Sequence, residues 1–404
     1  MVKKIILFLL LLAATGSIYA QQATVDSSAN FSNGIRHLRI SLLTCGPGDE
    51  EVWEVFGHTA LRVIDSDQHT DIVFNYGTFE FGPNFEMQFM RGKLNYCLAE
   101  ETFNGFMQEY VEAKRSVQEQ VLLLDWKQKE HIYDFLQWNA DPVNRYYKYD
   151  FFFDNCATRI RDLFPRPEVF GKKFQFGNAL PAGKALSFRD IINQYFHRDY
   201  WTRFGVNLLL GSRIDRVMTN KDIMFLPDYL RDGVGGGTVN GRPIATPPVL
   251  LLPAGNTLSD GTNWALMLAL GLALLTIAGL TIKPLRIMGR VMSSLLLLVT
   301  GLLGCLMLVM WFGTDHQGCA NNYNVLWCLP TNIIIAFFNP KGKGKYAIIA
   351  IILIVVSLLL HLLKVQCLLM PEFLPLLVSL LFIYGSIYVK SKNKAELKSI
   401  DNHA

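Results

Sequence analysis

Charged residues are scarce in this sequence, and closely spaced metal ligands are missing from it. Only 18% of the 404 residues are charged, whereas 51% are hydrophobic, a balance that argues against a wholly soluble protein. The formal net charge is only +4, and membrane topology explains the basic residues better than nucleic-acid binding does. No close pair of Cys or His residues has the spacing of a zinc site. We therefore expect neither a metal nor a cofactor.

The N-terminus has the pattern of a secretory signal peptide. Residues 1–20 contain two lysines, an apolar core of about ten residues and small residues up to Ala20. We expect cleavage before Gln21, with a retained N-terminal anchor as the alternative. The first cysteine is Cys45, which is too far from the cut to carry a lipid there. The chain that follows is expected outside the cytoplasm.

The C-terminal part contains five apolar runs, at 263–282, 291–312, 324–338, 346–364 and 371–389. Four of them approach or exceed the ~20 residues that cross a bilayer, whereas the run 324–338 is short and contains polar residues. Basic stretches follow the first, third and fifth runs, and basic loops stay in the cytoplasm. Five crossings satisfy all three stretches and four do not. The sequence thus predicts an all-α membrane domain of about five helices at 263–390, with a cytoplasmic tail at 391–404.

This topology places residues 21–260 outside the cytoplasm, beside the membrane surface. The loop 313–323 lies on the same side. Cys319 and Cys328 would then be in an oxidising compartment and can form a disulfide. The alternative is that Cys328 lies within the third span.

One domain of ordinary size precedes the membrane runs. Residues 21–231 mix segments typical of helices and of strands, and they suffice for a sizeable core of the α+β class. The stretch 232–262 is rich in Gly and Pro, a composition typical of a linker.

Two short runs with alternating polarity flank a polar loop and predict a β-hairpin, at 58–64 and 71–76. With a four-residue loop at 65–68, Arg62 lies opposite Asp71, a pairing that opposite charges favour. The same register places His58 opposite Asn75.

The stretch YDFFFDNCATRIRDLF (149–164) changes from an extended to a helical pattern. Asp154 or Asn155 is a good N-cap, which places Cys156 in the first helical turn. The helix dipole and the unpaired amides favour the thiolate there. Beside a histidine, such a thiolate is a nucleophile, and its backbone amide can stabilise an oxyanion.

Each of these residues has an ordinary structural explanation when it is taken alone. A buried cysteine is more often inert packing, a histidine at a strand start is more often structural, and an asparagine can cap a strand end. The order of the three carries the hypothesis. His58 would be the base, Asn75 would hold its tautomer, and Cys156 would be the nucleophile.

The chain resembles the Lnb N-terminal periplasmic domain family in three motifs, GPGDEEVWEVFGHTALRV, FNYGTFEF and DNCATRIRDLF. That family is similar to the permuted NlpC-type branch of the papain-like fold, which includes lecithin:retinol acyltransferase. The resemblance implies His58 as base and Cys156 as nucleophile. The third position often holds histidine in those acyltransferases, and here the match falls on Asn75. The motif GSRIDR (211–216) also resembles the family, without an assigned role.

The resemblance implies a lipoprotein N-acyltransferase of the bacterial inner membrane, with its catalytic domain in the periplasm. A phospholipid would donate an acyl chain to Cys156, and the thioester would pass it to the N-terminal amine of a diacylglyceryl lipoprotein. The residues alone indicate only acyl transfer near lipid. Two alternatives stay open: a periplasmic cysteine hydrolase that acts on peptidoglycan peptides or lipids, and a non-catalytic scaffold or sensor of the envelope.

Overall fold

The computed structural model describes residues 36–401 apart from 49–50, 80–83, 256–260 and 339. The predicted signal peptide, 1–20, lies outside the described residues. Within them, a mixed α/β domain precedes a part built of long helices, which agrees with the predicted fold class.

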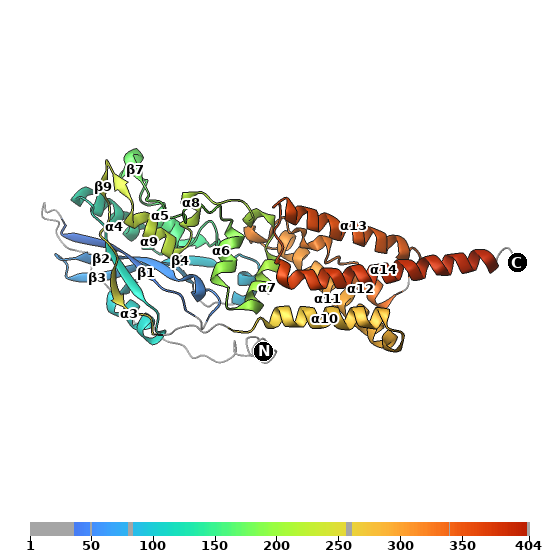
Figure 1. Ribbon diagram of the computed structural model, residues 1–404. Coiled ribbons are helices and arrows are strands. Elements are labelled where there is room, and N and C mark those ends of the chain that lie inside the picture. Colours follow the sequence, from blue (N-terminus) through green and yellow to red (C-terminus); the bar gives the residue numbers. More distant parts are fainter. Residues whose placement is uncertain (1–35, 49–50, 80–83, 256–260, 339, 402–404) are drawn as a thin grey trace. The chain divides into compact units, whose positions relative to one another are not determined.

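The first domain is built on an antiparallel sheet of seven strands in the order β10-β5-β1-β2-β3-β4-β6 (Figure 1). Its strands are β1 (Leu38–Cys45), β2 (His58–Asp65), β3 (Thr70–Phe79), β4 (Asn95–Thr102), β5 (Val117–Val121), β6 (Tyr146–Lys148) and β10 (Val249–Leu252). Side chains along β1 alternate between two hydrophobic clusters, as a strand with two covered faces requires. The sheet is therefore buried on both sides.

Different helices cover the two faces of the sheet. The larger cluster contains residues of α4 (Trp126–Ala140), α5 (Cys156–Arg161) and α9 (Pro227–Gly235). The smaller cluster contains Phe106 and Tyr110 of α3 (Phe103–Glu112). Capping boxes begin α4 and α5, at Asp125 and Asn155. The N-cap of Cys156's helix is therefore Asn155, one of the two predicted residues.

The β2–β3 hairpin forms, but the predicted register is wrong by two residues. Asp65 pairs with Thr70, and Arg62 lies opposite Val73 instead of Asp71. The turn begins one residue later than predicted because the Asp65 carboxylate accepts hydrogen bonds from two amides of the turn. A shift of two residues keeps every side chain on its predicted face. Arg62 still binds Asp71 through two hydrogen bonds of 2.8 and 2.6 Å.

Much of the stretch 232–262, predicted as a linker, belongs to the folded domain. Its strand β10 extends the main sheet beside β5, and β8 (Thr238–Val239) pairs with β7 (Phe174–Gln175) and β9 (Arg242–Pro243). The remaining elements of the domain are η2 (Glu54–Phe56), α2 (Phe85–Met90), η3 (Gly171–Lys173), α6 (Phe188–Tyr195), α7 (Tyr200–Leu209), η4 (Ser212–Ile214) and α8 (Asn220–Ile223).

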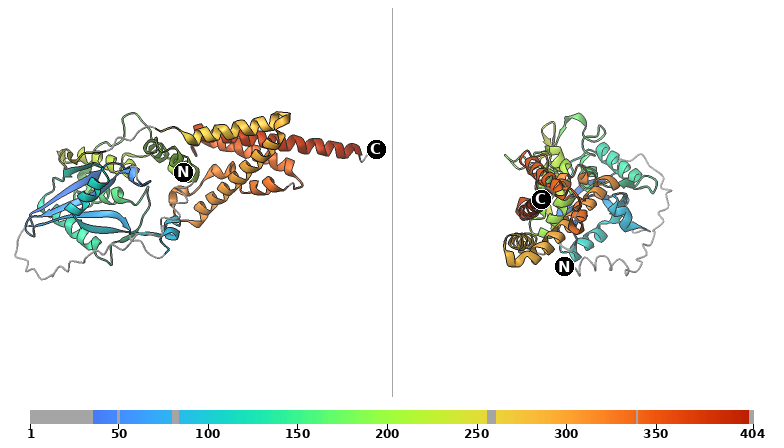
Figure 2. Two further views of the ribbon diagram at one scale, coloured as in Figure 1. Left: turned by 90° about the horizontal axis from the view of Figure 1, so that it is seen from below. Right: turned by 90° about the vertical axis from the view of Figure 1, so that its right-hand side faces the viewer.

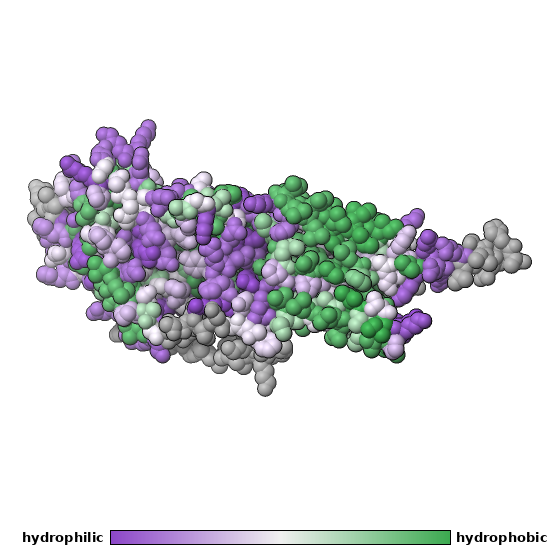
Figure 3. Space-filling view, viewed as in Figure 1, coloured by the Kyte–Doolittle hydropathy of each residue, from purple (hydrophilic) through white to green (hydrophobic). Residues whose placement is uncertain are grey.

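Among the residues described, four helices are long and apolar enough to cross a membrane. They are α10 (Trp264–Thr281), α11 (Arg286–Gly313, preceded by η5, Lys283–Leu285), α13 (Lys343–Leu362) and α14 (Met370–Asp401). Figure 2 shows them packed together, and Figure 3 shows hydrophobic side chains over the surface of this part. These helices coincide with four of the five predicted runs.

The third run is a broken segment and not a long helix. It consists of η7 (Tyr323–Leu326), a turn and α12 (Asn332–Phe337). It packs tightly on α11, where a side chain at Gly304 would collide with the carbonyl oxygen of Cys328. Asn332 binds Thr300 of α11 and the hydroxyls of Tyr346 and Tyr384 on α13 and α14. The polar residues of this run are therefore satisfied by neighbouring helices.

Cys319 and Cys328 are free thiols and do not form the disulfide considered from the sequence. Cys319, in η6 (Gln317–Cys319), belongs to the core cluster of the sheet domain. Cys328 belongs to the cluster between the long helices. The two side chains are thus committed to different cores.

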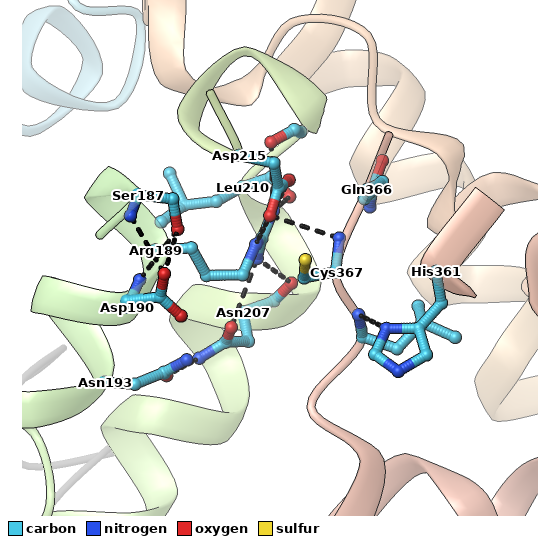
Figure 4. Close-up of polar contacts among 12 residues, drawn as sticks. Ser187, Arg189, Asp190, Asn193, Asn207, Leu210, Asp215, His361, Gln366 and Cys367 are labelled. Atoms are coloured by element: carbon cyan, nitrogen blue, oxygen red, sulfur yellow. Dashed lines mark hydrogen bonds and ion pairs between the residues drawn. The ribbon is translucent and has the colours of Figure 1, made fainter. Parts of the chain in front are cut away.

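The motif 211–216 joins the sheet domain to loops of the helical part (Figure 4). Arg189 and Asp215 form a buried ion pair, with side chains only 2% and 1% exposed. Asp215 also accepts the amide of Cys367, in the loop between α13 and α14. Gly211 donates to the carbonyl of Gly318, in the loop after α11. The motif that had no assigned role is therefore structural. We call the buried pair of Arg189 and Asp215, with the loop contacts of residues 211–216, the joint.

Candidate active site

Cys156 is held at the start of α5 by the hydrogen bonds of the preceding residue, Asn155. The side-chain amide of Asn155 donates to the carbonyls of Phe151 and Phe225, and its oxygen accepts the amide of Thr158. Cys156 itself is 8% exposed. The backbone amides of Thr59, Ala157 and Cys156 act to lower the pKa of its thiol. The sulfur therefore lies among oriented backbone donors.

His58 is the first residue of β2 and follows a glycine that the backbone requires. Gly57 has φ 73°, and a side chain there would also collide with the carbonyl oxygen of Cys45. The imidazole Nε2 of His58 donates to Asn75 Oδ1 over 2.6 Å. This bond places the proton of the neutral ring on Nε2 and leaves Nδ1 as the acceptor.

The hydrogen-bonded chain extends one residue beyond the predicted pair. Asn75 Nδ2 donates to Glu101 Oε1 over 3.0 Å, which fixes the orientation of the Asn75 amide. Glu101 lies on β4, beside β3. Burial raises the pKa of its carboxyl group, and the bond from Asn75 lowers it. His58, Asn75 and Glu101 thus form one network across three strands.

The thiol and the imidazole border the same small space. A Cβ built on Gly77 would lie 3.9 Å from Cys156 Cβ and 4.0 Å from His58 Cε1. Gly77 has φ 93° at a β-bulge of β3, so the bulge and the missing side chain leave this space open. The amide of Thr59, next to His58 in sequence, is one of those that lower the pKa of the thiol. The structure therefore brings Cys156, His58 and Asn75 together.

Both reactive groups are neutral at rest. Burial raises the pKa of the Cys156 thiol to about 11, against the lowering effect of the backbone hydrogen bonds. Burial likewise lowers the pKa of His58 to about 4, against the opposing effect of Asn75. The resting thiolate predicted from the helix N-terminus is therefore wrong, because burial outweighs the amides.

The sequence did not reveal Glu101. It lies in the run EET at the end of a strand, where an acidic residue is ordinarily a solvated side chain. Only the pairing of Val73 with Glu101, which puts the carboxylate near Asn75, could have found it. Within the described part of the chain, no group of three Cys, His, Asp or Glu residues could hold a metal.

Two family models match the chain. The Lnb N-terminal periplasmic domain matches residues 28–195, and the Lnb transmembrane domain matches residues 260–395. No curated protein and no solved structure matches. Together with the sheet domain and the apolar helices, these matches define a multi-pass membrane protein with a periplasmic domain. The chain belongs to the Lnb family.

Proposed function

We propose that this protein is a membrane-anchored cysteine acyltransferase of the inner membrane. Its substrates would be a phospholipid donor and the N-terminal amine of a diacylglyceryl lipoprotein. The observation that carries the proposal is the His58–Asn75 bond across Gly77 from Cys156, whose thiol also has backbone amides nearby that lower its pKa. A buried thiol that served only packing would need neither an oriented imidazole nor these donors.

The first half-reaction acylates the thiol. His58 Nδ1 takes the proton of Cys156 as the sulfur attacks an ester carbonyl of the phospholipid, since both groups are neutral at rest. The amides around the sulfur face the charge that develops on the carbonyl oxygen. When the tetrahedral intermediate collapses, the C–O bond breaks, His58 returns the proton to the leaving alkoxide, and a lysophospholipid departs.

The second half-reaction consumes the thioester. The neutral amine of the lipoprotein attacks the thioester carbonyl while His58 takes a proton from the nitrogen. The C–S bond then breaks and the sulfur recovers the proton. The products are an amide at the lipoprotein N-terminus and a free Cys156.

The membrane helices give the reaction its location. Both substrates are lipids of the same leaflet, so a site held over that leaflet meets them at a high effective concentration. An odd number of crossings is required to put the basic stretches after the first, third and fifth runs on one side. We propose that the broken segment 323–337 crosses the membrane in addition to the four long helices, which makes five crossings. We also propose that the periplasmic domain is of the permuted papain-like type.

Substitution of Cys156 by alanine tests the function. Mass spectrometry of lipoprotein N-termini, in cells that carry the variant as the only copy, is expected to find free amines in place of amides. The matched control is Cys305→Ala, which removes an exposed cysteine of α11 and should leave N-acylation intact.

A trapped intermediate separates the alternatives. Purified protein in phospholipid vesicles should carry a long-chain acyl group on Cys156 that hydroxylamine removes. Acylation followed by release of free fatty acid, in the presence of a diacylglyceryl peptide, would indicate a hydrolase instead. A Cys156→Ala variant that folds and leaves the lipoprotein amides unchanged would contradict the acyltransferase.

A further inference from the structure

A row of aromatic side chains leads away from the candidate site. A Cβ built on Gly77 would touch both Cys156 and the ring of Tyr149, each 3.9 Å away. From Tyr149, each ring contacts the next one in the row. The ring centroids are separated by 4.2 Å in Tyr149–Tyr96, 5.4 Å in Tyr96–Phe79, 5.4 Å in Phe79–Phe85 and 6.2 Å in Phe85–Phe89. The row therefore connects the thiol with helix α2.

Helix α2 exposes apolar side chains instead of burying them. Met87, Phe89 and Met90 are 46%, 45% and 57% exposed. Arg91 and Lys93, directly after the helix, are also exposed. Apolar side chains flanked by cations are typical of an element that lies at the surface of an anionic membrane.

Contacts with the helical part hold α2 close to the end of a membrane helix. The carbonyl of Arg91 accepts the amide of Asp315, and the carbonyl of Phe89 lies 3.2 Å from His316 Nε2. Asp315 also pairs with Lys148, beside Tyr149 in sequence. Asp315 and His316 follow α11, which ends at Gly313. This loop and α2 lie side by side (Figure 2).

We propose that α2 and the aromatic row bind the long acyl chain of the phospholipid donor and lead its ester to Cys156. The proposal rests on the proposed function and adds a binding site to it. A chain entering over α2 stays in contact with apolar side chains all the way, so it never crosses water. Arg91 and Lys93 stand where the donor's phosphate meets the membrane surface.

The occupant follows from the position of α2. A second protein would need a broad surface, whereas α2 offers a helix of six residues beside a membrane loop. The rings contact one another in a linear order, which fits a linear hydrocarbon laid along them.

Chain-length selectivity tests the proposal. Full-length protein in phosphatidylethanolamine vesicles is labelled with a palmitoyl phospholipid or with p-nitrophenyl butyrate, and intact mass reports the acyl group on Cys156. In a Met87→Glu/Met90→Glu variant, the ratio of long-chain to short-chain labelling is expected to fall at least tenfold, because the hydrocarbon then passes two carboxylates. The control Val143→Glu alters a residue that is 88% exposed and should leave the ratio unchanged. An unchanged ratio in the α2 variant would overturn the proposal.

Crosslinking with a photoreactive phospholipid tests the acyl-chain binding site even if the proposed function is wrong. If wild-type Cys156 accepts no acyl group, acyl transfer is refuted, but a diazirine placed in the acyl chain still reports where the chain binds. Crosslinks to residues 85–96, lost in the double glutamate variant and kept in Val143→Glu, would support the binding site. Crosslinks confined to α10, α11, α13 and α14 would refute it.

Discussion

Two buried polar networks serve this protein in different ways. At the joint, Arg189 binds Asp215 through two hydrogen bonds and also donates to Asn207, Leu210 and Gly211. Each guanidinium nitrogen therefore has a partner. At the candidate site, Nδ1 of His58 has no hydrogen bond to any described residue. The series of hydrogen bonds that begins at His58 Nε2 passes through Asn75 and stops at Glu101. A closed network fixes a position, whereas an open one retains a group that can exchange a proton.

This comparison predicts that variants at the two networks have separable effects. Joint variants should reduce stability and leave the pH profile of Cys156 labelling unchanged. Variants of His58's partners should alter rate and pH profile and leave unfolding nearly unchanged. If a variant of the joint shifted the pH profile of Cys156 labelling, the two networks would not have separate roles.

The largest stability effect is expected at the joint. Asp215→Ala leaves the Arg189 cation buried without its counter-ion, which costs about 3–5 kcal/mol of unfolding free energy. Thermal unfolding of the detergent-solubilised protein measures the change. The matched control is Arg216→Gln, in the same motif, which breaks an exposed pair with Asp222 worth about 0–1 kcal/mol. Equal losses in the two variants would contradict the assigned role of the joint.

Asn75 is expected to have the largest effect on rate among the partners of His58. Asn75→Ala frees the imidazole to rotate or change tautomer, so acylation of Cys156 by p-nitrophenyl butyrate should slow roughly 10²-fold, the lower end of the contribution of a positioned base. Asn75→Asp keeps an acceptor and should restore most of the rate. Its negative charge should also raise the pKa of His58 and move the acid limb upward. A merely structural Asn75 would give no such shift.

The pH profile of the wild-type protein sharpens the assignment of His58. Burial lowers its pKa from 6.5 to about 4, so the neutral base persists until the pH falls to about 4. The acid limb of Cys156 labelling should therefore have its midpoint near 4 and not near 6.5. Stability should also decline as the pH falls from 6.5 towards 4, because only the unfolded chain takes up the proton there. A midpoint at 6.5 would mean that His58 is solvated or is not the base.

Iodoacetamide, which needs no proton transfer to a substrate, probes the thiol itself. Burial raises the Cys156 pKa to about 11, so the alkylation rate should still increase at pH 9 to 10. Mass spectrometry of the 149–164 peptide follows the reaction, and free cysteine in the same buffer serves as the reference thiol. A plateau already at neutral pH would show a resting thiolate.

The sequence predicted what local patterns control. Apolar runs located the four long helices, alternation located β2 and β3, and Asn155 was one of two expected N-caps. The hairpin register was missed because the Asp65 carboxylate shapes the turn. β10 was missed because a Gly- and Pro-rich stretch can still add an edge strand once β5 offers free backbone groups. The GSRIDR motif was noticed, but its partner Arg189 lies 26 residues away from Asp215, beyond any local pattern.

The smallest effect on rate is expected in Glu101→Gln, and a comparison with Glu101→Leu shows how far the open network extends. Glu101→Gln can still accept from Asn75 Nδ2 but loses the charge, so the Asn75 amide keeps its orientation and the rate should fall only a few-fold. Glu101→Leu also removes the acceptor, which leaves the Asn75 amide free to flip and present its NH₂ group to His58 Nε2. That variant should approach the rate of Asn75→Ala. Short-chain labelling of both variants measures the difference. If Glu101→Leu and the wild type were labelled at equal rates, Glu101 would not belong to the functional network, because Asn75 would then need no support from β4.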